Sequence, residues 1–242
     1  MKNRIAFKLL WVLLLLVAGP MNSQKTIDTQ QLVWLRYYLK IQLNNSFQLQ
    51  QEVEERRFWS PWRQQQVITR TLVEVHLRKE WNAGMGMVYS LQSSPQDPEI
   101  HQVTNTAELR PLFELTFQQR LSEKIDLNHR FWSEFRFFEQ TDGSFEYANN
   151  RTRYKLELNY KASSKTSLKV FDEILLNIGG TNVFDQNRYG ASAQYTPLKN
   201  LGLELGYINW FQERPSATDF YKRHIMRFTL HQTISLKKTK TE

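Results

Sequence analysis

The sequence contains no cysteine, only nine glycines in 242 residues, and no apolar run of the roughly eighteen residues that a transmembrane helix needs. Without cysteine the chain forms no disulfide, has no thiol nucleophile and carries no lipid on a cysteine. A membrane location would therefore require strands rather than helices. The formal charge of +8 is spread along the chain, so we expect no nucleic-acid partner.

The N-terminus has the pattern of an export signal. Lys2, Arg4 and Lys8 precede an apolar run over residues 9–17, and a Gly-Pro break follows. The run is roughly ten residues long, too short to cross a bilayer as a helix. We expect residues 1–23 to be a cleaved signal peptide and residues 24–242 to form one exported domain.

Most of the remaining sequence alternates apolar and polar residues with a period of two, which is typical of strands exposed to different environments on their two faces. In the segment 200–212, Leu203, Leu205 and Tyr207 share one face and Glu204 lies on the other. About eleven such segments follow one another, joined by short turns that alternate with longer polar loops such as 141–150 and 179–187. This arrangement predicts a single up-and-down antiparallel meander.

The charged faces favour a transmembrane β-barrel over a soluble sandwich or a soluble barrel. A soluble core cannot hold many charges, because each costs several kcal/mol to desolvate, whereas an enclosed polar lumen can. We expect the apolar face to meet lipid and the charged face to line the lumen. The predicted lumen residues carry both signs of charge: Arg56, Arg70, Glu74, Arg78, Glu108, Arg110, Glu114, Arg120, Arg130, Glu134, Arg136, Arg188, Glu204 and Arg227.

Strand number and aromatic residues complete the predicted barrel. A chain that enters and leaves on the periplasmic side needs an even number of strands, so we predict about twelve, with ten as the alternative. Aromatic residues near the strand ends are interpreted as the interfacial girdles of an outer-membrane barrel. These include Trp34, Phe58, Trp59, Trp62, Trp81, Tyr160 and Trp210.

The loop, strand, turn and strand over 182–208, NVFDQNRYGASAQYTPLKNLGLELGYI, resemble the DUF2490 family, together with 168–178 and the closing segment 224–236. The resemblance covers most of the exported domain. It implies a predicted outer-membrane β-barrel, found mainly in Bacteroidota, with no established activity. It supplies no catalytic residues.

The residues themselves show little sign of catalysis. The five histidines are scattered, and the chain has neither an HExxH nor a GxSxG motif. His129 and Ser133 share a predicted outer face but lie about 13–14 Å apart along one strand. We expect no cofactor and no metal. A lipid A or phospholipid hydrolase and a soluble periplasmic binding barrel remain as alternatives.

Two interpretations of the charged lumen stay open. The charges either form a ladder of Arg–Glu pairs that fills a narrow, structural barrel presenting its loops, or line a conduit that attracts small polar or anionic solutes. In both cases the expected partners are outer-membrane lipid and, during insertion, the barrel-assembly machinery. We expect a monomer in the bacterial outer membrane.

Overall fold

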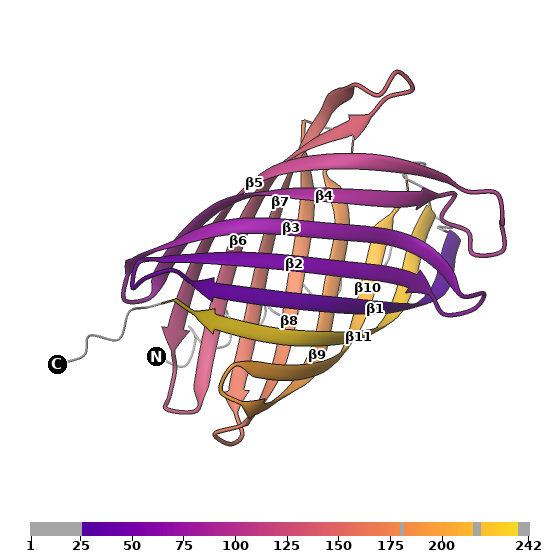
Figure 1. Ribbon diagram of the computed structural model, residues 1–242. Coiled ribbons are helices and arrows are strands. Elements are labelled where there is room, and N and C mark those ends of the chain that lie inside the picture. The colour runs from indigo at the N-terminus through magenta and orange to yellow at the C-terminus, as the bar shows by residue number, and fades with distance from the viewer. Residues whose placement is uncertain (1–25, 180–181, 215–218, 237–242) are drawn as a thin grey trace, which may run out of the picture.

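The computed structural model describes residues 26–179, 182–214 and 219–236, and the predicted signal peptide lies outside them. The described chain forms one closed barrel in which consecutive strands are neighbours (Figure 1). Its strands are β1 (Thr26–Gln42), β2 (Phe47–Phe58), β3 (Arg63–Arg78), β4 (Trp81–Ser94), β5 (Thr104–Arg120), β6 (Ile125–Glu139), β7 (Phe145–Lys161), β8 (Thr166–Ile178), β9 (Phe184–Leu198), β10 (Leu201–Glu213) and β11 (Asp219–Ser235). The predicted all-β, up-and-down barrel is confirmed.

The two ends of the barrel differ in their connections. At one end, called the short-turn end, strands are joined by the turns 43–46, 79–80, 121–124, 162–165 and 199–200. In three of these turns a side-chain oxygen, from Asn44, Ser122 or Ser163, accepts hydrogen bonds from backbone N–H groups two and three residues further on. The opposite, long-loop end includes the connection 95–103.

The strand number differs from the prediction. The described barrel has eleven strands, neither twelve nor ten. With an odd number, the first and last strands run in the same direction, so the barrel closes through a parallel pairing of β1 with β11 from Thr26↔Asp219 to Gln42↔Ser235. Parallel strands form a continuous ladder of slanted hydrogen bonds. The predicted even number of strands was wrong because β1 begins at the long-loop end, whereas β11 ends at the short-turn end.

Strands extend further toward the long-loop end than the polar composition suggested. Residues 145–150 belong to β7 and residues 184–187 to β9, although both were predicted as loop. Backbone pairing continues there because each strand still has an antiparallel neighbour, for example Phe145 opposite Glu139. The β6–β7 hairpin consequently projects beyond the rest of the barrel (Figure 1).

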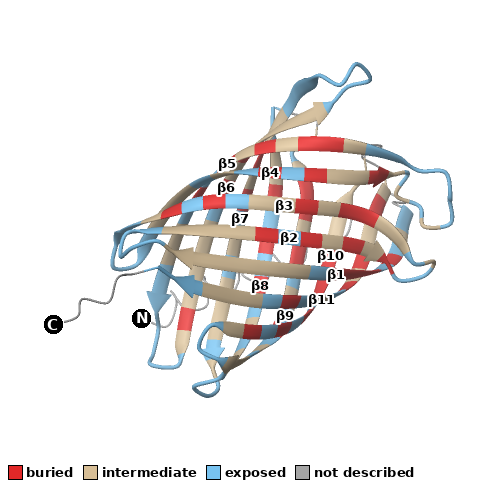
Figure 2. Ribbon diagram, viewed as in Figure 1, coloured by how far each residue is buried: buried red, intermediate tan, exposed pale blue. Residues whose placement is uncertain are grey.

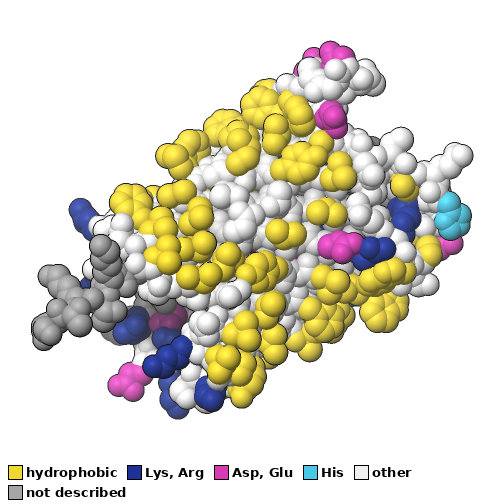
Figure 3. Space-filling model, in the orientation of Figure 1, with side chains coloured by type: hydrophobic (Ala, Val, Ile, Leu, Met, Phe, Trp, Pro, Cys, Tyr) yellow, Lys and Arg dark blue, Asp and Glu magenta, His cyan; other side chains and the backbone are white. Residues whose placement is uncertain are grey.

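The apolar face of each strand points away from the barrel interior, as predicted. Large apolar side chains stay exposed, with Met85 at 61%, Phe113 at 52% and Leu203 at 52%, and they cover much of the outer surface (Figure 3). Buried positions alternate with these along the strands (Figure 2). Among the described residues, no helix is long and apolar enough to span a bilayer.

Part of the predicted aromatic girdle was placed wrongly. Trp34, Phe58 and Trp210 are buried and belong to an apolar cluster inside the barrel. Trp59 and Trp62, in the connection after β2, are exposed as predicted. Trp34, Phe58 and Trp210 are buried because they lie on the same face of their strands as the interior charges.

We predict that Gly86 is required for close packing inside the barrel. A Cβ atom at Gly86 would lie 2.1 Å from the Thr71 carbonyl oxygen and 2.9 Å from the Leu72 Cα. Because both are backbone atoms, Gly86→Ala has to displace a strand, and we expect a loss of about 1–3 kcal/mol in the free energy of unfolding. Urea unfolding of the folded barrel measures it.

Gly202→Ala is the matched control, because the nearest atom there is the terminal nitrogen of the flexible Gln194 side chain at 3.0 Å. Equal losses for the two variants would contradict the close-packing argument.

Candidate functional site

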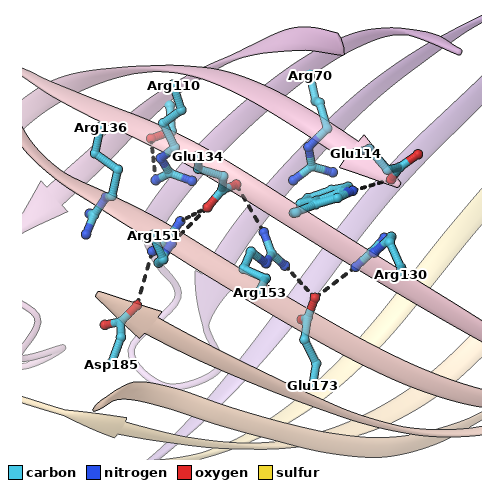
Figure 4. Close-up of polar contacts among 12 residues, drawn as sticks. Arg70, Arg110, Glu114, Arg130, Glu134, Arg136, Arg151, Arg153, Glu173 and Asp185 are labelled. Atoms are coloured by element: carbon cyan, nitrogen blue, oxygen red, sulfur yellow. Dashed lines mark hydrogen bonds and ion pairs between the residues drawn. The ribbon is translucent and has the colours of Figure 1, made fainter. Parts of the chain in front are cut away.

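Arginine and glutamate side chains from neighbouring strands meet inside the barrel (Figure 4). The carboxylate of Glu134 is fully buried and pairs with Arg151 at 2.7 Å and with Arg153 at 3.2 Å. Arg153 also reaches Glu173 at 2.9 Å, and Arg130 reaches the same carboxylate at 2.8 Å. These contacts link β6, β7 and β8 into one network.

A second part of the network is centred on Glu108, which is 1% exposed. Arg110 and Arg136 each lie 2.5 Å from its carboxylate. Arg151 extends the network to Asp185 at 3.3 Å. Glu108, Glu134 and Glu173 thus each contact at least two guanidinium groups, which compensate the cost of removing a charge from water.

Trp132 lies among these charges rather than apart from them. Its indole N–H donates to Glu114. The guanidinium groups of Arg70, Arg130 and Arg153 lie 4.5, 4.1 and 4.5 Å from its ring centre. The ring therefore adds cation–π contacts to three arginines that each also pair with a carboxylate.

The strand register explains how local sequence builds these pairs. Glu134 lies directly opposite Arg151 in the β6–β7 pairing, and Glu52 lies opposite Arg70 in the β2–β3 pairing, where the two side chains are 2.9 Å apart. Directly opposed side chains on one face are within contact distance. Alternation selects the face, and register selects the partner.

Two cavities occupy the barrel. The short-turn cavity, with a volume of about 480 Å³, is lined by ten Lys or Arg and six Glu side chains. The long-loop cavity, of about 420 Å³, is lined by eight Arg side chains and by Asp185 and Glu213. Both cavities share Arg56, Arg70, Arg153 and Arg188 in their walls. Cations thus outnumber carboxylates in both linings.

Two of the buried carboxylates, those of Glu108 and Glu134, lie behind the arginines with which they pair. Glu108 and Glu134 are absent from the described lining of both cavities, whereas their partners Arg110, Arg136 and Arg151 line the long-loop cavity. This part of the long-loop cavity consequently presents guanidinium groups. Such a surface attracts anions.

Two tryptophan rings meet where the cavities adjoin, since Trp34 lines the short-turn cavity and Trp210 lines the long-loop cavity. Trp34 and Trp210 meet edge to face with ring centres 5.7 Å apart. Arg56 lies 3.8 Å from the Trp34 ring centre, and Arg188 lies 4.6 Å from that of Trp210. We call these four residues the central constriction.

The family model described as a protein of unknown function (DUF2490) matches residues 31–221. The chain belongs to the DUF2490 family. A comparison with curated proteins finds no match. Among solved structures, this DUF2490 protein is similar to a structure of the NanC porin in a rhombohedral crystal form, with a TM-score of 0.50 and 11% identity. The match covers 82% of this chain and 96% of the porin chain, and it shows a shared barrel fold.

The predicted lumen residues of the DUF2490 barrel differ in where they lie. Of the two cavities, Glu114, Arg130, Glu204 and Arg227 line just the short-turn cavity, and Arg110 and Arg136 line just the long-loop cavity. Arg56, Arg70 and Arg188 line both cavities, and Glu108 and Glu134 line neither, because they lie behind their arginine partners. Glu74 lines two smaller hollows.

Arg78 and Arg120 do not reach the cavities, contrary to the prediction. Both occur at the short-turn end of their strands and are exposed, and the Arg120 side chain is 72% exposed beside Asp126. Alternation assigned them to the inner face, but a side chain at the rim of a barrel can extend into solvent. The alternation of side chains along a strand gives the face of a residue but not its position along the barrel axis.

Several residues of the site were missed. They include six that line the cavities, Arg36, Arg151, Arg153, Lys155, Lys169 and Glu173, and the buried Arg223, which lines neither cavity. The alternation of β7 offered the signal, because Tyr154 and Leu156 point outward and Arg153 and Lys155 therefore had to point inward.

His231, His129 and Ser133 each have a hydrogen-bond partner. His231 Nε2 lies 3.0 Å from a Glu204 oxygen, and His129 Nδ1 lies 2.8 Å from the Tyr154 hydroxyl. Ser133 exchanges hydrogen bonds with Asn150. Within the described ranges, no three His, Asp or Glu side chains are arranged to hold a metal ion.

Proposed function

We propose that this protein is an outer-membrane β-barrel whose cationic lumen passes small anionic solutes. The observation that carries the proposal is the excess of cationic side chains in the lining of two successive cavities; in the long-loop cavity, Glu108 and Glu134 also lie behind their arginine partners. Rings of charge of one sign select ions of the opposite sign in pores.

The outer surface supports a membrane location. Leu203, Leu205 and Phe228 are 52%, 47% and 46% exposed, whereas a soluble barrel would turn such side chains inward. The strands have 12 to 17 residues and are therefore long enough to cross a bilayer, which takes about 9–11 residues. The partners proposed on this basis are outer-membrane lipid and the assembly machinery that inserts barrels, with the protein acting as a monomer.

Planar-bilayer recordings test the conduction and its selectivity. Under a potassium chloride gradient, we expect single-channel steps with a reversal potential that indicates several-fold preference for chloride, because low-dielectric walls strengthen the field of the lumen arginines. Arg188→Gln removes a charge shared by both cavities and should reduce the preference. Arg120→Gln, at the exposed rim, should leave it unchanged.

A cation preference, or a selectivity that Arg188→Gln does not alter, would contradict an anion pathway through the lumen. A folded barrel without current steps would favour a second candidate, a structural barrel that presents the projecting β6–β7 hairpin. The packed central constriction is the observation that favours this alternative.

We propose no catalytic role. The test is the lipid A and phospholipid mass profile of a deletion strain, which we expect to match that of the parent. An altered profile would favour a lipid-modifying enzyme.

A further inference from the structure

We infer that the long-loop cavity binds an acidic sugar, meaning a polyhydroxylated ligand that carries a carboxylate, phosphate or sulfate group. The inference deepens the proposed anion pathway by assigning a substrate class to one of its cavities. The long-loop cavity has a volume of about 420 Å³, which falls in the range of roughly 300–1,000 Å³ typical of small-molecule sites.

The anionic group is assigned to the wall formed by β5, β6 and β7. Arg110, Arg136, Arg151 and Arg153 come from these three adjacent strands and line the cavity. Their partner Glu134 is fully buried and Glu108 nearly so, so the guanidinium groups lie between those carboxylates and the cavity. The planar fork of an arginine matches the geometry of carboxylate and phosphate oxygens.

The hydroxyl groups are assigned to a second wall that is rich in amides. Eight amide side chains line the cavity, from β3, β4, β8, β9, β10 and two connections: Gln65, Gln66, Gln92, Gln96, Asn177, Asn182, Gln186 and Gln212. An amide offers both a donor and an acceptor, which is what a sugar hydroxyl requires of its partner. A simple anion would leave most of these amides unused.

Some of this hydrogen-bonding capacity is unfilled within the protein. Among the described residues, Gln65 Oε1, Asn177 Oδ1 and Arg188 Nε are buried atoms without a hydrogen-bond partner. The same cavity is lined by the rings of Trp210, Tyr221 and Phe184, which can cover the apolar face of a sugar.

The short-turn cavity differs and serves as an internal comparison. Six Glu side chains and three glutamines, Gln50, Gln194 and Gln232, line it, and Lys169, Arg227 and His231 share the carboxylate of Glu204 at its wall. Cations there are more fully paired and amides are fewer. We therefore place the sugar in the long-loop cavity.

Titration calorimetry on the full-length folded protein in detergent, at low salt, tests the assignment. The probes are glucuronate, glucose 6-phosphate, glucose, acetate and inorganic phosphate. Glucuronate or glucose 6-phosphate should bind at least about tenfold more tightly than glucose, acetate or phosphate, because only these two engage both walls. The two acidic sugars distinguish a carboxylate from a phosphate preference.

Two variants locate the site. Arg136→Gln should weaken binding of the tighter acidic sugar by about tenfold while leaving Arg110 to pair with Glu108. Gln92→Leu should weaken acidic-sugar binding but not phosphate binding. Lys169→Gln is the matched control, because it also removes one of several cations around a single carboxylate but lies in the short-turn cavity, and it should leave the affinity unchanged. Heat-dependent gel mobility verifies that each variant is folded.

Glucose binding as tightly as glucuronate and glucose 6-phosphate, simple anions binding as tightly as acidic sugars, or no detectable binding would each overturn the assignment. So would an equal effect of Lys169→Gln and Arg136→Gln. Binding without conduction would refute the channel but keep the site, whereas chloride conduction without acidic-sugar binding would refute the site alone.

Discussion

Replacing Glu134 by glutamine is expected to destabilise the barrel by about 3–5 kcal/mol. Glu134 is fully buried and pairs with both Arg151 and Arg153, so its neutralisation leaves two guanidinium charges with too little compensation. The loss should fall near the lower end of this range, because Asp185 still contacts Arg151 and Glu173 still contacts Arg153. The midpoint of urea unfolding of the reconstituted barrel measures the effect.

Two further variants make this test specific. Glu146→Gln removes an exposed carboxylate from the projecting β6–β7 hairpin, and surface substitutions of this kind usually change stability by about 0.5 kcal/mol or less. The double variant Glu134→Gln/Arg151→Gln should be less destabilised than the sum of its single variants, because the residues share one contact. Additive losses would show that the ion pair does not act as a unit.

Placing an arginine at Leu205 is expected to reduce the free energy of unfolding by about 2–4 kcal/mol if the outer surface faces lipid. Leu205 is 47% exposed on β10 and lies opposite Phe228 and Ala193, within the apolar surface of the barrel. An arginine there has to be desolvated in the hydrocarbon region. Unfolding of Leu205→Arg in lipid vesicles measures the loss.

The control is Ile27→Arg, at the long-loop end of β1 and 52% exposed. A charge near the membrane boundary costs about 0–1 kcal/mol. In a water-soluble barrel neither substitution would be disruptive, so equally small effects would refute the proposed membrane location. The comparison tests depth in the bilayer rather than the chemistry of arginine.

The candidate site shows how far alternation along one strand can be used. On β7 the outward positions of Tyr154 and Leu156 imply that Arg153 and Lys155 point inward, and the structure places both in the lining of the short-turn cavity. Alternation could not give their partners. Arg153 joins Glu134 on one neighbouring strand to Glu173 on the other, and these contacts depend on two strand registers.

Aromatic residues mark another limit of strand patterns. Trp34 and Trp210 occur in strands separated by most of the chain, and their sequence context resembles that of interfacial residues. Closure of the barrel through β1 and β11 brings them to a ring distance of 5.7 Å, with Arg56 and Arg188 against them. The alternation along single strands could not predict this constriction, because it forms only when the barrel closes.

The amino-acid sequence alone determined the all-β class, the order of hairpins and the face of most side chains, because a strand alternates its side chains whatever it pairs with. Tertiary structure decided the odd strand number, the parallel closure, the depth of Arg78 and Arg120, and the division of the lumen into two cavities. These depend on register and curvature, which arise only when all strands pair around one axis.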